Sequence, residues 1–361
     1  MKISVDCRHI DSSGIGVYAR ECLSFLLNSS NRFYLFGDPE KLKFAANKQN
    51  VKIIPCTIKP FSLRETFAFP VNFLEIINNG DLYYSPYFNV PSGIKVPVYT
   101  TIHDIIFPDM PELTSFIGLK IRMWFYRRSF RLSRKIFTVS QFSKSRIEHY
   151  AENKVPVIVT YNAIQSYFFS TSSQNENTSN KKPEKNDFIL FVGNIKKHKG
   201  LGCLLDAFFE ARNCGLKQRL LIVGSSGNFR SKDDAFNEKL SLFKNNEVHF
   251  TGSIPDIELK RLYSEASLLV QPSLYEGFGI PPLEAMYSGT LPLISDIPVF
   301  NEIYGEFPVV FFKTGDSVDL KEKLLSLLLN KEAPKITLND NLLNRYSYKL
   351  TAEIILREIS A

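Results

Sequence analysis

Short apolar runs alternate with helix-length segments of mixed polarity along most of the chain. In the first half, this pattern predicts strands at Ile3–Val5, Phe33–Phe36, Val51–Ile54, Leu82–Tyr84, Val98–Ile102 and Ile136–Val139. In the second half, it predicts strands at Phe188–Val192, Leu220–Val223, Val248–Phe250, Leu268–Val270 and Leu291–Ile294. Two successive series of alternating strands and helices indicate an α/β protein with two parallel, doubly wound sheets.

The predicted helices include Val17–Leu27, Phe116–Arg134 and, near the end of the chain, Tyr348–Ile359. Between the two series lies a stretch without any aromatic or aliphatic residue, which is typical of a solvated linker. We therefore expect an N-terminal domain at 1–169, a linker at 170–187, a C-terminal domain at 188–342 and a final helical segment at 343–361.

The composition limits the classes of protein that are possible. At 361 residues with 44% hydrophobic residues, the chain can form two domains with proper cores. No apolar run reaches the roughly eighteen residues of a membrane-spanning helix, and the first ten residues indicate a strand, not a secretory signal. Five scattered cysteines without a Cys-x-x-Cys pair disfavour a zinc site and favour reduced thiols in the cytoplasm.

The positive charge is concentrated in the first half, which favours an anionic partner for that half. Residues 1–180 contain 21 Lys and Arg against 14 Asp and Glu, whereas residues 181–361 contain 23 of each. The predicted helix at 117–135 has seven basic residues and no acidic one, interspersed with apolar residues such as Ile117, Ile121 and Trp124. Two interpretations stay open: an ordinary helix with one solvated face, or a helix that contacts an anionic membrane surface.

The most informative segment is the fifteen-residue run PSLYEGFGIPPLEAM, in which Glu276 and Glu284 flank Gly277-Phe278-Gly279. The pair Pro281-Pro282 indicates the start of a helix, since proline suits the first helical position. Backbone N–H groups at such a start attract anions, and the available donors would be those of Gly279, Ile280 and Leu283. Anion-binding amides beside two carboxylates suit a ligand with phosphates and hydroxyls, namely a nucleotide sugar.

Three further motifs follow predicted strands. The strand at 188–192 leads into Gly193-Asn194-Ile195-Lys196-Lys197-His198-Lys199-Gly200, a cationic loop that could also be simply solvated. Gly14 and Gly16 follow the first strand, but the third glycine of a dinucleotide fingerprint is missing, which disfavours a hydride-transfer enzyme. His103-Asp104 ends another strand, where a lone histidine is usually structural.

Together these segments resemble the family-4 glycosyltransferases, retaining enzymes of the GT-B fold, and in particular a bacterial polysaccharide-synthesis branch. The resemblance implies two facing Rossmann-like domains with a cleft between them and a last helix that returns to the N-terminal domain. It implies a catalytic role for His103, Lys199 and Glu276. The residues that it implies for donor binding are Gly14, Gly16, Gly193, Asn194, His198, Lys199, Glu276, Gly277, Phe278, Gly279, Ile280 and Glu284.

In more detail, the resemblance implies that Lys199 binds the donor diphosphate, Glu276 the hexose hydroxyls and Glu284 the ribose diol. His103 would lie near the transferred sugar. Many relatives carry an arginine where this chain has Asn194, so the second fixed cation is in question; Lys197 or His198 could replace it. No metal or other cofactor is expected, since the chain has no Asp-x-Asp and protein cations would do the work of the metal.

The implied function is retaining transfer of a hexosyl group by front-face displacement. GDP-mannose is the favoured donor, with UDP- or dTDP-hexoses open, and the expected acceptor is a lipid-linked glycan of a bacterial surface polysaccharide. Such an enzyme would be cytoplasmic, at most peripheral to the inner face of the cell membrane. The alternatives are a nucleotide-sugar 2-epimerase of related fold and a basic nucleic-acid-binding protein; the latter is disfavoured because no recognised module accompanies the basic residues.

Overall fold

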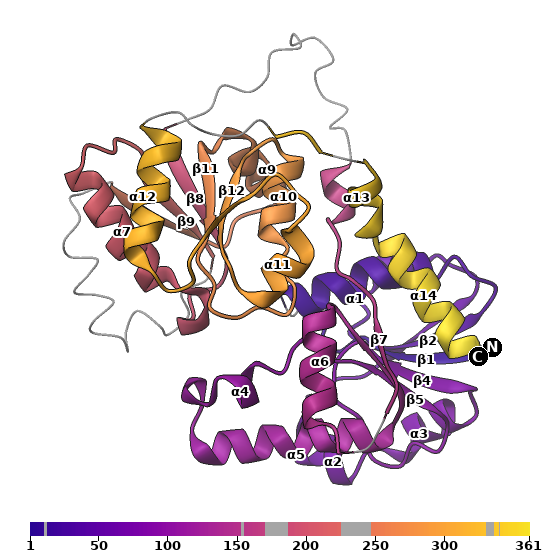
Figure 1. Ribbon diagram of the computed structural model, residues 1–361. Helices are drawn as coiled ribbons and strands as arrows, with labels where there is room; N and C mark the ends of the chain where they lie inside the picture. The colour runs from indigo at the N-terminus through magenta and orange to yellow at the C-terminus, as the bar shows by residue number, and fades with distance from the viewer. Residues whose placement is uncertain (11–12, 153–154, 170–186, 225–246, 330–335, 339) are drawn as a thin grey trace, which may run out of the picture. The chain divides into compact units, whose positions relative to one another are not determined.

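The computed structural model describes all residues except 11–12, 153–154, 170–186, 225–246, 330–335 and 339. The described chain divides into two compact units (Figure 1). Unit 1 comprises 1–165 and 345–361, and unit 2 comprises 166–344. The predicted linker at 170–187 lies outside the described residues except for Asp187.

Within the described residues, unit 1 contains a seven-stranded sheet in the order β3-β2-β1-β4-β5-β6-β7. Every neighbouring pair of strands is parallel. The strands are β1 (Lys2–Asp6), β2 (Arg32–Gly37), β3 (Val51–Pro55), β4 (Leu82–Ser85), β5 (Val98–Thr101), β6 (Ser133–Thr138) and β7 (Val157–Val159). The helices are α1 (Ser13–Leu26), α2 (Leu63–Phe67), α3 (Val71–Asn78), α4 (Ile106–Asp109), α5 (Phe116–Leu132), α6 (Gln141–Tyr150) and α14 (Tyr348–Ser360), with the 3-10 turns η1 (Lys43–Ala45) and η2 (Pro111–Leu113).

In its described part, unit 2 repeats the same topology with a six-stranded parallel sheet in the order β10-β9-β8-β11-β12-β13. The strands are β8 (Phe188–Val192), β9 (Arg219–Val223), β10 (Val248–Gly252), β11 (Leu268–Gln271), β12 (Pro292–Ser295) and β13 (Val310–Phe312). The helices are α7 (Leu201–Asn213), α9 (Asp256–Glu265), α10 (Pro281–Tyr287), α11 (Pro298–Tyr304) and α12 (Ser317–Leu328), with η3 (Ser166–Phe168) and η4 (Lys197–Lys199). A further helix, α13 (Asp340–Arg345), spans the boundary between the units.

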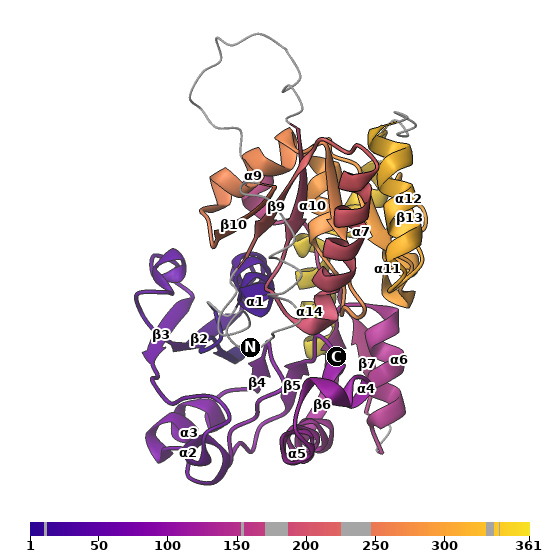
Figure 2. The same cartoon turned by 90° about the vertical axis from the view of Figure 1, so that its left-hand side faces the viewer.

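In each sheet the strand order reverses next to the unit's first strand, between β1 and β4 in unit 1 and between β8 and β11 in unit 2. Open parallel sheets bind ligands at the carboxyl ends of the strands beside such a switch point. The central strands are buried because helices cover the sheet, as their nearly uninterrupted apolar sequences predict. In unit 2, for example, α7 and α12 pack against each other (Figure 2). The α/β class and the two parallel sheets predicted from the sequence are therefore confirmed.

The last helix belongs to unit 1, as the resemblance implied. Helix α14 lies alongside α1 (Figure 1), and its Ala352, Ile355 and Ile359 are buried in the same core as β1. At its end, Lys135 Nζ lies 3.0 Å from the Glu358 carboxylate. The final segment is thus held to unit 1 by apolar burial, with one peripheral ion pair.

The sequence pattern missed β7 and β13, which are the last strands at one edge of each sheet. Each has only three residues, too few to show a period. Two helix bounds were also wrong. Helix α1 begins at Ser13, four residues before the predicted start, and α5 ends at Leu132 because Ser133 is already extended and begins β6.

We expect Ile355→Ala to lower the free energy of unfolding by about 2–4 kcal/mol, because it leaves a cavity under α14. Leu350→Ala on the same helix removes an exposed side chain, and its effect should stay within about 0.5 kcal/mol. Urea unfolding of the two variants measures the difference. Equal effects would show that α14 does not stabilise unit 1 through this buried face.

Candidate functional site

In unit 2, Lys199 lies on the loop after β8, at the end of the one-turn helix η4. The next residue, Gly200, has a φ of +67° and marks the start of α7. A β-carbon on Gly200 would lie 1.8 Å from the Pro272 carbonyl oxygen, so only glycine lets this loop approach the segment after β11 so closely. The N–H of Leu274 donates to the His198 carbonyl at 2.8 Å and joins the two loops. The fold therefore sets Lys199 directly against the segment that follows β11.

Glu276 is the partner of Lys199. The Lys199 Nζ lies 2.7 Å and 2.8 Å from the two carboxylate oxygens of Glu276, and both side chains are largely buried. Ser273 donates its hydroxyl to Glu276 Oε1 at 2.7 Å, and Gln271 Nε2 donates to the Ser273 hydroxyl. Two of the three residues predicted to be catalytic are thus brought into contact, and both come from loops at the switch point of the unit 2 sheet.

The electrostatics of this pair favour the charged forms. Burial would raise the pKa of Glu276, but the Lys199 charge and the hydrogen bonds from Lys199 and Ser273 outweigh it, so the pKa lies below its ordinary value. Burial and the neighbouring Lys199 lower the pKa of His198 to about 4. At neutral pH, His198 is therefore uncharged in this structure, and the replacement of the second cation by Lys197 or His198 stays a prediction.

Glu284, the second carboxylate of the motif, is buried on α10 and accepts a hydrogen bond from the Tyr263 hydroxyl at 2.7 Å. This contact raises the pKa of Tyr263 further than burial alone does. Tyr263 lies on α9 and has no sequence signal that would have identified it. In this structure Glu284 is held inside unit 2, and its predicted contact with a ribose stays a prediction.

The Gly277–Ile280 turn joins the two carboxylates. Gly277 and Phe278 are buried, Gly279 and Ile280 are half-buried, and the Tyr304 hydroxyl donates to the Gly279 carbonyl. The prediction for Leu283 was wrong: its N–H donates to the Ile280 carbonyl at 2.9 Å and is used inside the helix. Three amides were predicted to bind an anion. The Leu283 amide is used in the first turn of α10, so the candidates are now the amides of Gly279 and Ile280.

Gly193 and Asn194 begin the loop at the carboxyl end of β8. The N–H of Gly193 donates to the Val223 carbonyl of β9 at 2.9 Å, which fixes the start of the loop to the sheet. Asn194 follows it and is half-buried. Both residues are therefore on the switch-point side of the sheet, on the same loop as Lys199.

In unit 1, His103 follows β5 and is buried, with its Nε2 3.0 Å from the Pro86 carbonyl oxygen. Because a carbonyl oxygen can only accept, Nε2 carries the proton in this contact and Nδ1 keeps its lone pair. Burial lowers the pKa of His103 to about 4, and the Tyr18 ring packs edge-on at 4.9 Å. The imidazole is neutral at physiological pH. Asp104 accepts from the N–H of Ile106 and so orders the following turn.

The two glycines near the N-terminus differ in their surroundings. The predicted loop is the first turn of α1, which contains both Gly14 and Gly16. A β-carbon on Gly16 would lie 2.4 Å from the Ile10 carbonyl oxygen, so Gly16 is required by packing within unit 1. A β-carbon on Gly14 would meet no atom within 4 Å, so Gly14 has room for a ligand to approach.

Sequence reasoning missed a buried network in unit 1 that is centred on Arg8. Arg8 donates to both oxygens of Asp6 and to Glu65, and Asn89 donates to both carboxylates. Burial alone would raise the pKa of Asp6, but the Arg8 charge and hydrogen bonds hold it well below its ordinary range. Glu65 and Asn89 lie far away in sequence, so no local signal could have identified them.

The described residues contain neither a candidate metal site nor a helix that could span a membrane. Within the part of the chain that the structure describes, no three His, Cys, Asp or Glu side chains are grouped so that they could hold a metal ion. Among the same residues, no helix has the length and apolar character needed to cross a bilayer.

The family model and the most similar sequences reported below all describe glycosyltransferases. Residues 172–340 match the family model described as Glycosyl transferases group 1. The chain is 31% identical over 207 residues to the O-antigen chain mannosyltransferase RfbU of Salmonella typhimurium, covering 56% of this chain and 53% of that protein. It is 27% identical over 239 residues to the O-antigen chain mannosyltransferase B of Escherichia coli, covering 63% and 60%. The chain thus spans little more than half the length of these relatives.

The whole chain is also similar to a solved structure. The crystal structure of Anabaena Alr3699/HepE in complex with UDP and glucose superposes with a TM-score of 0.75 at 18% identity, covering 100% of this chain and 99% of that one. At this identity the similarity shows the fold, and it confirms the GT-B class implied by the sequence.

We expect Lys199→Met to lower the free energy of unfolding at pH 7 by about 3 kcal/mol, because it leaves the Glu276 carboxylate buried without its cation. The pKa of Glu276 is depressed by folding, so its stabilising contribution is present above the ordinary value near pH 4 and is lost as the pH falls through the folded pKa. The difference between wild type and variant should therefore shrink from pH 7 to pH 3 in urea unfolding. When Glu276 is replaced by Gln in both proteins, the effect of Lys199→Met on the free energy of unfolding should no longer depend on pH. If it still does, another titrating group causes the pH dependence.

Proposed function

We propose that this chain, whose residues 172–340 belong to the group 1 glycosyl transferases, transfers a hexosyl group from a nucleotide sugar to a glycan acceptor. The observation that carries the proposal is the contact of Lys199 with Glu276 at the switch point of the unit 2 sheet. A cation and a carboxylate at that edge match the two chemical needs of a nucleotide sugar. The cation neutralises the diphosphate, and the carboxylate accepts hydrogen bonds from sugar hydroxyls.

Mannose is the favoured sugar, with GDP-mannose as the donor and UDP- or dTDP-hexoses as alternatives. The support is the similarity to the two O-antigen mannosyltransferases of Salmonella typhimurium and Escherichia coli. We further propose a lipid-linked glycan acceptor in bacterial surface-polysaccharide synthesis, on the cytoplasmic side of the cell membrane. The HepE complex with UDP and glucose supports a nucleotide-sugar donor without deciding its base.

The roles of the residues follow from their chemistry. Lys199 would stabilise the departing diphosphate, together with the N–H groups of Gly279 and Ile280, since charge that develops on a leaving group is best met by fixed donors. Glu276 would then turn from Lys199 to the hexose hydroxyls. His198 is neutral in this structure and can contribute a hydrogen bond. His103, with its proton on Nε2, offers its Nδ1 as an acceptor and does not act as a cation.

We expect Lys199→Ala to lower kcat with the accepted nucleotide sugar by about 10²–10³-fold, because it removes the charge that meets the leaving group. Lys196→Ala is the matched control: it removes an exposed lysine from the same loop and should keep activity within about twofold. Transfer to the glycan acceptor, measured for both variants after their folding has been checked, gives the comparison. Undiminished turnover by Lys199→Ala would end the proposed role.

We propose that transfer proceeds with retention at the anomeric carbon and without a metal ion, with the donor phosphate itself accepting the acceptor's proton. The one-bond coupling between C1 and H1 of the transferred sugar in the first product, read by NMR, should show the configuration of the donor. The same reaction in EDTA should keep its rate, because Lys199 supplies the positive charge. An inverted product or a rate restored only by a divalent cation would contradict the mechanism. Conversion of the donor to its 2-epimer without acceptor would identify an epimerase instead.

A further inference from the structure

Unit 1 exposes apolar side chains on one side of two helices that are distant in sequence. Leu63 and Phe67 of α2 are 78% and 70% exposed, and Ile117 of α5 is 70% exposed. Ile121 and Trp124 continue from Ile117 at steps of four and three residues, so these three side chains form one stripe along α5. The ring centroids of Phe67 and Trp124 are 6.3 Å apart, so the exposed residues of the two helices meet in one patch.

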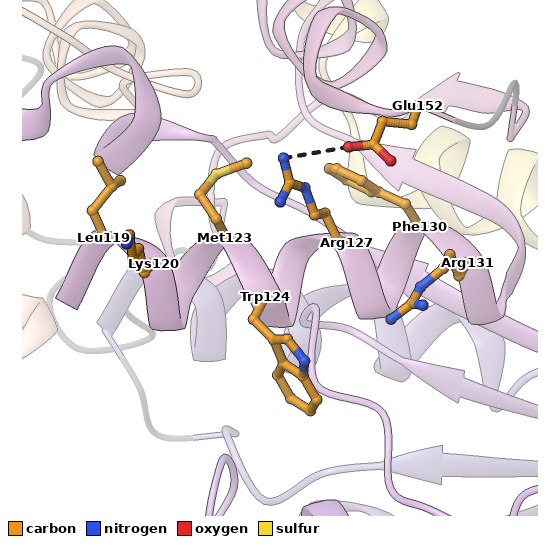
Figure 3. A pocket seen from close by; sticks show the side chains of 8 residues that line it. All are labelled: Leu119, Lys120, Met123, Trp124, Arg127, Phe130, Arg131 and Glu152. Atoms are coloured by element: carbon orange, nitrogen blue, oxygen red, sulfur yellow. Dashed lines mark ion pairs between the residues drawn. The ribbon is translucent and has the colours of Figure 1, made fainter. Parts of the chain in front are cut away.

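A basic stripe runs beside this apolar one. Lys120, Arg127 and Arg131 follow one another at steps of seven and four residues, and α5 contains no acidic residue. With neighbouring apolar side chains they line a hollow of about 790 Å³ (Figure 3). The hollow has one carboxylate, Glu152, which lies 3.3 Å from Arg127 in a pair whose members are both more than half exposed. Such an exposed pair is weak in water, so three cations outweigh one acid here.

The cations and the apolar groups are also interleaved. Lys120 Nζ lies 4.4 Å from the centroid of the Phe116 ring, and the Arg128 guanidinium lies 5.8 Å from that of Trp124. Figure 3 shows Met123 and Arg127 on the side of α5 that faces Glu152, and Trp124, which lines the same hollow, points away from Glu152. The apolar and the basic groups are therefore spread around an exposed surface instead of forming a dry centre with a polar rim, as a protein interface would.

We infer that this surface, made by α2 and α5, docks onto an anionic lipid bilayer. The apolar side chains of Phe67, Ile117, Ile121 and Trp124 would enter the interfacial layer, where aromatic rings are well accommodated. Lys120, Arg127 and Arg131 would meet the lipid phosphates, the long stems of these side chains lying along the apolar surface. The inference goes beyond the proposed function and uses only residues of unit 1, so it stands or falls independently of the donor site.

The experiment is sedimentation of the full chain with vesicles of a zwitterionic phospholipid, with and without an anionic phospholipid. We expect binding only to the anionic vesicles, weakened as the salt is raised from about 0.1 M to 1 M. Arg127→Glu with Arg131→Glu should weaken binding by about tenfold or more. The matched control, Lys43→Glu with Lys313→Glu, changes the net charge equally at exposed lysines elsewhere and should bind like wild type.

A second pair of variants tests the apolar stripe. Ile117→Ser with Ile121→Ser should also weaken binding about tenfold, whereas Ile257→Ser with Val318→Ser, at exposed apolar positions of unit 2, should not. All four variants alter exposed side chains, so their melting temperatures should match that of wild type. Absence of binding to anionic vesicles, or equal loss in test and control variants, would overturn the inference. If the chain does not bind vesicles but its molecular mass in light scattering doubles as its concentration is raised, and the Ile117→Ser with Ile121→Ser variant stays monomeric, the surface binds a second copy of the chain instead. That result would overturn the inference.

Discussion

The ion pair between Lys199 and Glu276 is the contact on which the interpretation of unit 2 depends. Its two members come from the loops after β8 and β11, which neighbour each other only because the strand order reverses at this point. Gly200 allows the close approach, and the Ser273 hydroxyl donates a second hydrogen bond to the carboxylate. A buried carboxylate is stable as an anion only when a cation and hydrogen-bond donors surround it, and this one has both. The strand order brings the two loops together, and the Lys199–Glu276 ion pair determines which chemical groups can bind there.

Unit 1 has the same strand order, yet its switch point contains different chemistry. There Asp6, the last residue of β1, and Glu65 accept hydrogen bonds from Arg8, and Asn89 from the segment after β4 donates to both carboxylates. The guanidinium is 3% exposed and its donors are directed to protein acceptors. A fully satisfied buried network stiffens a unit, whereas it offers little to a ligand. The repeated topology therefore serves structure in one unit, while in the other it leaves a largely buried, ion-paired lysine at the edge of the sheet.

The sequence predicted what short-range patterns can encode. The buried strands and the long helices followed from apolar runs, from Gly and Pro, and from position after a strand, whereas the joint role of Lys199 and Glu276 was implied only by the family resemblance. It could not predict β7 and β13, whose three residues show no period, nor the early start of α1. Within the site, Ser273 was visible as a residue of the motif, but Tyr263 and Tyr304 reach it from other helices. It also assigned the Leu283 amide to a ligand, because the sequence alone does not show that the first turn of α10 would use it.

The state of charge around Lys199 has a consequence for donor binding. With His198 neutral and Glu276 ionised, the lysine and its carboxylate form a locally neutral pair. A diphosphate that approaches this pair must compete with Glu276 for the same ammonium group. A hexose that offers hydroxyls to Glu276 gives the carboxylate new hydrogen-bond donors. Breaking the Lys199–Glu276 pair therefore costs less free energy when the diphosphate carries a hexose than when it does not. On the proposed function, the same pair would therefore favour the intact nucleotide sugar over the nucleoside diphosphate that remains after transfer.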